Sequence, residues 1–412
     1  MLRSLLLACA VWTLAACAPM LVEPRLASNQ PGPADFDGID SLLTEQGLDV
    51  LLVHGMCSKD QDWARQALAE LATLLNTSLP TEMPKPTVLG PGGIELHQAT
   101  LQTTRGPVRA NAVLWSPLTR PLKQDLCYDQ SHKSSICSPP ALDPPAPAYG
   151  YPRARLNRAL KDMLLNDCLA DALAYQGAAH EAFVARMQEA LLQALDSSGA
   201  TTASATAAGK AQRLATRTEP LVVITSSLGS KMVFDALLDL VRRGDALQQS
   251  AARRTYDRIA TVFMRANQIP MLALADTALQ PAPDKAMALR QPSARGAAPD
   301  PIAALEENRQ RPPPRPSDAR KAVAATATLD GRLQLVAFTD PNDVLSYVLV
   351  PGPIGQNANY RIVDVVLSTA PTLLGLVASP LDAHQDYDSN ASVARFIACG
   401  TTDRALCQLA PR

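Results

Sequence analysis

The chain has 412 residues, which is long enough for two or three small domains or for one large α/β domain. Hydrophobic residues make up 47% of it and charged residues 19%, so a disordered or fibrous chain is excluded as a description of the whole. The formal charge of −1 gives no electrostatic footprint for nucleic acid or for anionic lipid. With 34 prolines, about 8% against a typical ~5%, we expect long loops or linkers to interrupt the core.

The N-terminus has the pattern of an export signal. Arg3 is followed by a largely apolar stretch over residues 4–16, which is too short to span a membrane and which ends at Cys17. The sequence LAAC at residues 14–17 resembles the lipobox of bacterial lipoproteins, in which the chain is cut before the cysteine and the thiol is acylated.

This resemblance implies a signal peptide over residues 1–16 and a lipid anchor on Cys17. Ala18 rather than aspartate follows the cysteine, which by similarity to sorted lipoproteins favours the outer membrane, with the protein facing the periplasm or the cell surface. We expect residues 17–40 to be a tether and residues 41–412 to form the body. No other stretch approaches 18 uninterrupted apolar residues, so membrane attachment would come from the lipid.

Six of the eight cysteines remain once Cys9 and Cys17 are set aside, and an even number in an oxidising compartment predicts disulfides. Six cysteines allow 15 connectivities. Closeness along the chain favours Cys127 with Cys137, Cys399 with Cys407 and, as the remaining pair, Cys57 with Cys168. A reactive thiol is the alternative role for Cys57. No CxxC spacing occurs and the five histidines are scattered, so the sequence predicts neither a zinc site nor a haem site.

Apolar runs alternate with amphipathic stretches along the chain, which predicts an α/β fold with a mostly parallel sheet flanked by helices. The predicted strands are 48–53, 94–103, 108–115, 221–224, 259–264, 333–338 and 362–367. A helix is predicted after the first strand, with Ser58 and Gln61 as a capping box. Further helices are expected over 181–195, 392–398 and after the strand that ends at residue 224.

Three segments are predicted to lie outside this pattern. Residues from about 116 to 196 hold three cysteines and a Pro-rich stretch, and we expect a cap insertion held by disulfides. Residues 196–218 are rich in Ala, Ser and Thr, which predicts a low-complexity linker. Residues from about 277 to 329 include nine prolines between 281 and 316, which is typical of a flexible insertion.

The segment LVVITSSLGS at residues 221–230 contains the candidate catalytic serine. A buried strand leads directly into small residues around Ser227 and then into a helix. This arrangement resembles the nucleophile elbow of α/β hydrolases, in which a tight turn lifts the serine Oγ clear of the sheet. Thr225 departs from the family pattern, which has a glycine at that position, and Ser226 leaves a second serine beside the turn.

The residues VHGM at positions 53–56 resemble the turn that completes the oxyanion hole in the same family. The resemblance implies that the backbone N–H groups of Met56 and Leu228 stabilise the oxyanion. Because Gly55 has no side chain, other backbone can approach it closely. We expect His54 to stabilise the turn through hydrogen bonds, and a role as the base is the alternative.

In this family the acid and the base follow the nucleophile in the chain order Ser, Asp, His. The residues TDPNDVL at 339–345 come directly after a predicted strand, where the resemblance places the acid. Asp343 is preferred there and Asp340 is the alternative. His384 follows the last predicted strand, in the loop from which the family delivers its histidine, and is the predicted base.

The resemblance therefore implies a serine hydrolase that cleaves carboxylic ester or thioester bonds through an acyl-enzyme on Ser227, with His384 and Asp343 completing the triad. Its substrate would be a small-molecule or lipid ester, and neither a metal nor an organic cofactor would be needed. Nucleic acid is not an expected partner. The alternative is a non-catalytic envelope lipoprotein that uses a hydrolase-like fold for binding or scaffolding.

Overall fold

The computed structural model describes residues 23–90, 93–130, 134–138, 143, 150–196, 206–276, 333–356, 360–372, 378–401 and 407. The predicted signal peptide, Cys17 and the predicted insertion at about 277–329 lie outside these residues. Among the residues that are described, no helix combines the length and the hydrophobicity needed to cross a bilayer.

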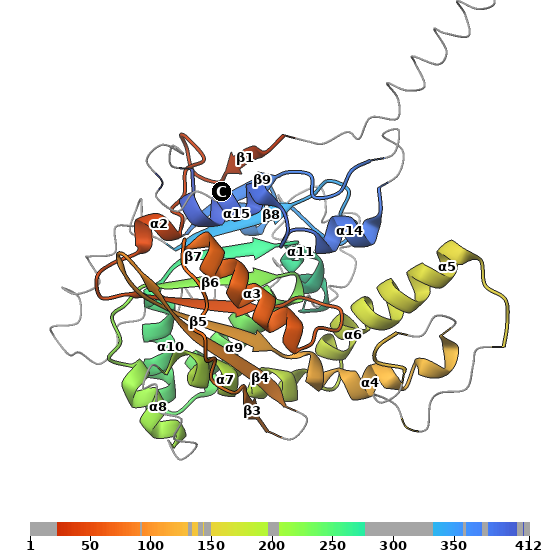
Figure 1. Ribbon diagram of the computed structural model, residues 1–412, viewed down its shortest axis with the longest axis horizontal. Coiled ribbons are helices and arrows are strands. Elements are labelled where there is room, and N and C mark those ends of the chain that lie inside the picture. Colours follow the sequence, from red (N-terminus) through yellow and green to blue (C-terminus); the bar gives the residue numbers. More distant parts are fainter. Residues whose placement is uncertain are drawn as a thin grey trace, which may run out of the picture.

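The described residues form one nine-stranded sheet with helices on both faces (Figure 1). In chain order its strands are β1 (Arg25–Ser28), β2 (Leu48–Val53), β3 (Thr87–Leu89), β4 (Ile94–Thr103), β5 (Gly106–Leu114), β6 (Leu221–Ser226), β7 (Ile259–Arg265), β8 (Gln334–Thr339) and β9 (Arg361–Val366). Across the sheet the order is β1-β9-β8-β7-β6-β2-β5-β4-β3. Neighbours from β9 to β5 run parallel, whereas β1, β3 and β4 form antiparallel pairs. The prediction of a mostly parallel α/β sheet is confirmed, and β6 lies at its centre.

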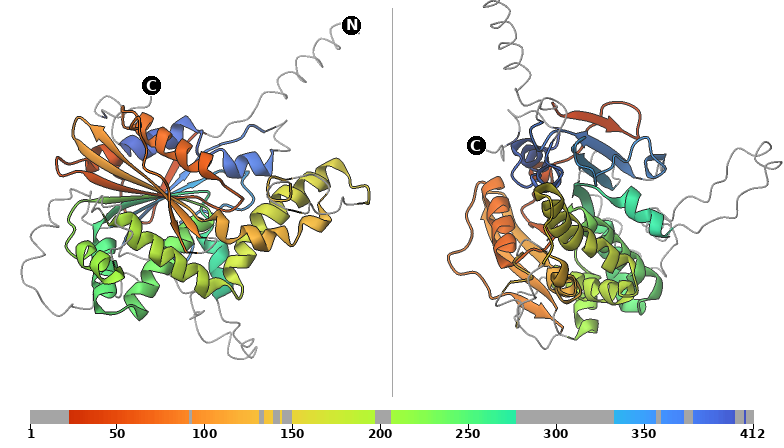
Figure 2. Two further views of the ribbon diagram at one scale, coloured as in Figure 1. Left: turned by 60° about the horizontal axis from the view of Figure 1, so that its bottom comes forward. Right: turned by 90° about the vertical axis from the view of Figure 1, so that its right-hand side faces the viewer.

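Two helical layers enclose the sheet, as the edge-on view in Figure 2 shows. One layer consists of α2 (Ile39–Leu42), α3 (Gln61–Leu74) and α15 (Ala391–Cys399), and the other of α7 (His180–Leu195), α8 (Ala207–Leu214), α9 (Leu228–Arg243) and α10 (Ala246–Arg258). The connections contain α11 (Ile269–Leu272), η4 (Ala273–Asp276), η5 (Ile354–Gln356) and α14 (Pro380–Gln385).

Alternate residues of the central strands pack against opposite helical layers. In β2, Leu51 and Val53 belong to the core on the α7 and α9 side, whereas Val50 and Leu52 belong to the core on the α3 and α15 side. Every residue of β2 is buried, as expected for a parallel strand that is covered on both faces. Because both faces are covered, the largely apolar sequence at residues 48–53 indicates a buried strand.

The segment between β5 and α7 projects from the body as an arm (Figures 1 and 2). It contains η1 (Ser116–Leu118), α4 (Arg120–Gln124), η2 (Cys127–Asp129), α5 (Arg155–Ala159), the π-helical η3 (Leu160–Leu169) and α6 (Ala170–Gln176). One disulfide, Cys127–Cys137, lies within the arm. A second, Cys57–Cys168, joins the arm to the turn after β2.

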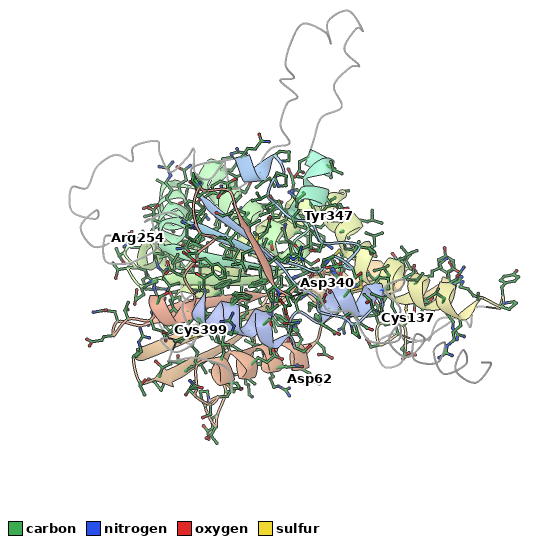
Figure 3. The ribbon with its side chains drawn as sticks, turned by 90° about the horizontal axis from the view of Figure 1, so that it is seen from above. Asp62, Cys137, Arg254, Asp340, Tyr347 and Cys399 are labelled. Carbon is green, nitrogen blue, oxygen red and sulfur yellow. A yellow bond between two sulfur atoms is a disulfide. The ribbon has the colours of Figure 1, made fainter. Side chains whose placement is uncertain are left out.

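The third disulfide, Cys399–Cys407, lies at the end of α15, and Figure 3 shows Cys399 on the body, well away from Cys137 on the arm. All three predicted pairings are therefore confirmed. The alternative of a reactive thiol at Cys57 is excluded in this structure, because its sulfur is bonded to Cys168.

The predicted capping box at the start of α3 is wrong. The cap is Asp60, whose carboxylate accepts hydrogen bonds from the N–H groups of Asp62 and Trp63. Ser58 is directed to the arm instead, where its hydroxyl donates to Asp167. The acceptor on the arm cannot be inferred from the local sequence around α3.

Two further segments are more ordered than the sequence predicts. Within the predicted linker 196–218, Thr206 caps α8, and Leu214 of that helix is buried in the core. Within the predicted tether 17–40, β1 pairs antiparallel with β9, and Phe36 is buried against the α15 layer. The folded body therefore begins before residue 41.

Candidate active site

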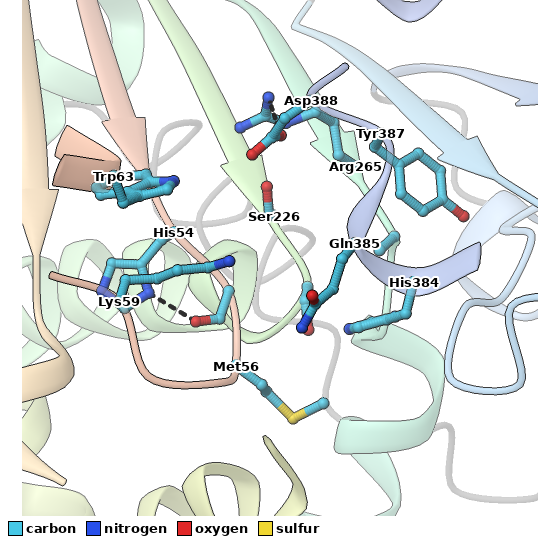
Figure 4. A pocket seen from close by; sticks show the side chains of 13 residues that line it. His54, Met56, Lys59, Trp63, Ser226, Arg265, His384, Gln385, Tyr387 and Asp388 are labelled. Carbon is cyan, nitrogen blue, oxygen red and sulfur yellow. Dashed lines mark hydrogen bonds and ion pairs between the residues drawn. The ribbon is translucent and has the colours of Figure 1, made fainter. Parts of the chain in front are cut away.

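The segments that follow β2, β6, β7, β8 and β9 all begin at the same side of the sheet, at the carboxyl ends of the strands, because these five strands run parallel. A cavity of about 30 Å³ lies at this side. Its lining includes Met56, Ser227, Arg265, His384 and Tyr387, which come from four of these segments (Figure 4). The topology thus brings together residues that are far apart in the sequence.

Ser227 occupies a strained turn between β6 and α9. Its φ of 51° and ψ of −126° lie in a region that residues with a side chain rarely adopt, which costs of order 1–3 kcal/mol. Its N–H donates to the carbonyl oxygen of Arg265 at 2.7 Å, which anchors the turn to β7. The residue is 2% exposed, and its Oγ has no hydrogen-bond partner among the described residues. A buried hydroxyl without a partner, held by a strained turn, is an unusual feature for a structural serine.

Two glycines allow this turn to contact the turn after β2. A Cβ on Gly229 would lie 2.4 Å from the carbonyl oxygen of His54, and a Cβ on Gly55 would lie 2.6 Å from the Cβ of Ser227. The two turns are therefore packed backbone against backbone. The N–H groups of Met56 and Leu228, which adjoin these contacts, donate no hydrogen bond within the part of the chain that the structure describes.

Thr225, the departure from the family pattern, makes specific contacts in the structure. Its Oγ1 lies 2.7 Å from the Oγ of Ser230 and 3.3 Å from the carbonyl oxygen of Phe263, to which it donates. A hydroxyl thus joins the last residues of β6 to the first turn of α9 and to β7. The side chain is fully buried with its polar atom satisfied, which explains how the turn accommodates it.

His384, from α14, is paired with Asp343 from the turn after β8. The Nδ1 of His384 lies 2.9 Å from Oδ1 and 3.0 Å from Oδ2 of Asp343. Asp343 also accepts hydrogen bonds from the hydroxyl of Tyr387 at 3.1 Å and from the N–H of Leu345 at 3.0 Å. Both members of the pair are buried, so the imidazole is held in one orientation with Nε2 left for another partner.

Asp340 is engaged elsewhere. Its Oδ1 accepts from the N–H of Asn342 at 2.7 Å, and its Oδ2 accepts from the hydroxyl of Thr369 at 2.9 Å. These bonds join the turn after β8 to the loop after β9. The structure therefore brings Asp343, and not the alternative Asp340, against the imidazole of His384.

His54 stabilises its turn and is not placed to act as a base. Its Nδ1 donates to the carbonyl oxygen of Gly55 at 2.7 Å, and its Nε2 accepts from the N–H groups of Trp115 at 3.0 Å and Ser116 at 3.2 Å. Burial lowers the pKa of His54 to about 3, and the nearby Lys59 and Lys123 charges act in the same direction. The ring is therefore neutral at physiological pH, with both nitrogens occupied.

The arm is bound to the turn after β2, which packs against the turn at Ser227. Beyond the disulfide, the N–H of Ser58 donates to Asp167 of the arm at 3.0 Å. Within the arm, Lys123 forms an ion pair with the same carboxylate at 2.8 Å. The side-chain amide of Gln385, next to the predicted base, donates to the sulfur of Cys57 at 3.3 Å. Sequence reasoning missed Asp167, Gln385 and also Tyr387, because no local pattern marks residues whose partners are distant in the chain.

The site thus holds a serine hydroxyl without a partner among the described residues and a histidine that lines the same cavity and is paired with a carboxylate. These are the groups that nucleophilic acyl transfer requires. Within the described ranges, no group of three or more His, Cys, Asp or Glu side chains is arranged to hold a metal ion. Comparisons of the chain with protein-family models, with curated proteins and with solved structures find no match.

Proposed function

We propose that this chain is a serine hydrolase of the α/β-hydrolase type that cleaves carboxylic ester or thioester bonds. The observation that carries the proposal is the buried Ser227 hydroxyl, which has no partner among the described residues and lies on a strained turn in a cavity that His384, the partner of Asp343, also lines. The order Ser, Asp, His along the chain and the position of each residue after a parallel strand support the same assignment.

In the proposed reaction, Nε2 of His384 takes the proton of Ser227 while Oγ attacks the substrate carbonyl. Asp343 holds the imidazole with Nδ1 protonated and stabilises the imidazolium that forms. The N–H groups of Met56 and Leu228 donate to the oxyanion, where each such donor typically contributes ~10²–10³ in rate. The bond to the alcohol or thiol then breaks, and the imidazolium of His384 gives its proton to this leaving group, so that Ser227 is acylated. Water attacks the acyl carbonyl while Nε2 of His384 takes its proton, and the proton passes to Ser227 Oγ as the carboxylic acid leaves.

A non-catalytic binding role is the second candidate, and one observation favours it. No hydrogen bond joins Ser227 Oγ to His384, and the cavity of about 30 Å³ holds little more than water. Catalytic hydrogen bonds are often long without substrate and shorten only in the complex, so we regard this geometry as a closed form of the proposed enzyme.

Labelling with a fluorophosphonate probe, followed by peptide mass spectrometry, tests the proposal. We expect the folded protein to be labelled on Ser227, and Ser227→Ala to be unlabelled. The matched control is Ser226→Ala, which removes the neighbouring hydroxyl and should leave labelling intact. Equal labelling of Ser227→Ala would exclude Ser227 as the nucleophile, and no labelling of folded protein would support the non-catalytic role instead.

We also propose that acylated Cys17 attaches the protein to the bacterial outer membrane. The support is the LAAC sequence at residues 14–17 and the absence of aspartate after it. Metabolic labelling with palmitate in a bacterial host that has an outer membrane should mark the wild type and not Cys17→Ala. Label that persists in Cys17→Ala, or wild-type protein found free of membranes, would contradict this anchor.

A further inference from the structure

A second, larger hollow of about 480 Å³ adjoins the cavity that contains Ser227. It lies between the start of α3 and the first part of the arm, and its lining includes Lys59, Asp60, Glu95, Leu114, Pro117 and Arg120. A volume of this size falls within the usual range for small-molecule sites. The cavity around Ser227 is too small for more than the reacting atoms, so the rest of a substrate must lie elsewhere.

Two cations in this hollow lack partners. Neither the ammonium of Lys59 nor the guanidinium of Arg120 forms a hydrogen bond or an ion pair with any described residue, and the Nε of Arg120 is buried without an acceptor. A buried cationic N–H that has lost water without gaining an acceptor is unfavourable, and an anionic ligand would satisfy it.

The two acidic residues that line the hollow are already engaged. Asp60 is the N-cap of α3, and its carboxylate accepts hydrogen bonds from two N–H groups in the first turn of that helix. Glu95 accepts from the side-chain amide of Gln61 at 2.9 Å and lies 3.4 Å from Nε2 of His97. The hollow therefore presents two free positive groups while its carboxylates are held by other partners.

Lys59 connects this hollow to the proposed nucleophile, because it also lines the cavity with Ser227 and His384. Figure 4 shows the Lys59 side chain extending along the cavity beside His54 and Trp63. An ester whose carbonyl reaches Ser227 would thus place its next few atoms beside the Lys59 ammonium.

We propose that the hollow binds an anionic group of the substrate, a carboxylate or a phosphate, through Lys59 and Arg120. The inference names the substrate class of the proposed hydrolase and rests on that proposed function. The substrate is then an ester with a negative charge a few bonds from the scissile carbonyl, and neutral esters of equal length bind less well.

Matched p-nitrophenyl esters test the proposal: the neutral valerate and the glutarate monoester, which carries a carboxylate at the end of an acyl chain of the same length. We expect the wild type to prefer the glutarate monoester in kcat/KM. Lys59→Met and Arg120→Met should each lower the ratio of kcat/KM for the glutarate monoester to kcat/KM for the valerate ester about tenfold, the effect of losing one charge-assisted bond. Lys59→Arg should retain the preference.

The control is Lys85→Met, which removes an exposed lysine that lines neither the hollow nor the cavity around Ser227. This variant should keep the preference for the glutarate monoester. Calorimetric titration with glutarate and with inorganic phosphate separates the two anion chemistries without relying on turnover. No preference for the charged ester, or one that survives in both methionine variants, would overturn the inference while leaving the hydrolase standing. Anion binding that depends on Lys59 and Arg120 in a protein that hydrolyses no ester would instead overturn the proposed hydrolase alone.

Discussion

The Cys57–Cys168 disulfide joins the turn beside the proposed nucleophile to the arm, and we expect its removal to lower both stability and turnover. The bridge spans a sequence separation of 111 residues, whereas Cys399–Cys407 spans 8. A disulfide lowers the entropy of the unfolded chain, and this effect raises the free energy of unfolding by about 5 kcal/mol for the long loop and about 2.5 kcal/mol for the short one. Losing the long bridge should therefore destabilise the fold more, by up to about 2.5 kcal/mol.

The effect on turnover follows from the position of Cys57 directly after Met56. Cys57 has a φ of 73°, a left-handed conformation that a non-glycine residue adopts only when its surroundings enforce it. Without the bridge, the contacts of Ser58 with Asp167 remain as the main attachment of this turn to the arm. We expect the N–H of Met56 to lose its fixed direction, which lowers kcat by up to about 10²-fold, the cost of one oxyanion donor.

The measurement compares the double variants Cys57→Ser/Cys168→Ser and Cys399→Ser/Cys407→Ser. Urea unfolding gives the stability of each, and p-nitrophenyl ester hydrolysis gives kcat per folded molecule, with folding checked by near-UV circular dichroism. The second variant is the matched control, because it loses a disulfide far from the cavity and should keep its kcat. Equal kcat in both folded variants would refute the link between the arm and the turn.

Four further substitutions test individual groups. Tyr387→Phe removes a hydroxyl that donates to Asp343 and accepts the N–H of Asp340, so kcat for ester hydrolysis should fall about tenfold; an unchanged kcat would show that this bond does not position the acid. Asp343→Asn should lower kcat about 10⁴-fold, whereas Asp340→Asn should mainly lower stability in urea, by about 1–3 kcal/mol; the reverse pattern would exchange their roles. Burial raises the pKa of Asp364 to about 6 from its ordinary 3.8, so its contribution to stability is complete below pH 4 and is lost as the pH rises through 6. Wild type should therefore lose up to about 3 kcal/mol more than Asp364→Asn between pH 4 and 7.5 in urea unfolding, and parallel pH profiles would contradict this.

The central strands could be predicted because their signal is local. The observed bounds of β2 and β4 coincide with the predicted runs at 48–53 and 94–103. By contrast, β1 and β3 are short, and three of the four residues of β1 are exposed, so neither leaves an apolar pattern. Their strand conformation depends on pairing with β9 and β4, which the sequence alone does not indicate.

The turn at Ser227 was predictable for a similar reason. A buried strand, a run of small residues and a helix follow one another without interruption, and Gly229 and Gly55 lie where a side chain would collide with the facing turn. The residues that hold the surrounding groups were not predictable, because their partners are distant in the chain: Asp167 is 109 residues from Ser58, and Tyr387 is 44 residues from Asp343. Local patterns therefore indicate the strained turn at Ser227 better than they indicate the residues that position the groups around it.

Asp340 and Asp343 show where sequence reasoning reaches its limit. They lie three residues apart in one turn after the same strand, and residue type, spacing and strand context are alike for both. What separates them is the surroundings of each carboxylate: Asp340 accepts from the loop after β9, whereas Asp343 accepts from His384 and Tyr387. A carboxylate whose acceptor sites are filled by Thr369 and Asn342 has little capacity left for an imidazole. The different surroundings of the two carboxylates are thus a property of the fold, and they predict that in Asp343→Asn the remaining Asp340 does not take over the pair with His384.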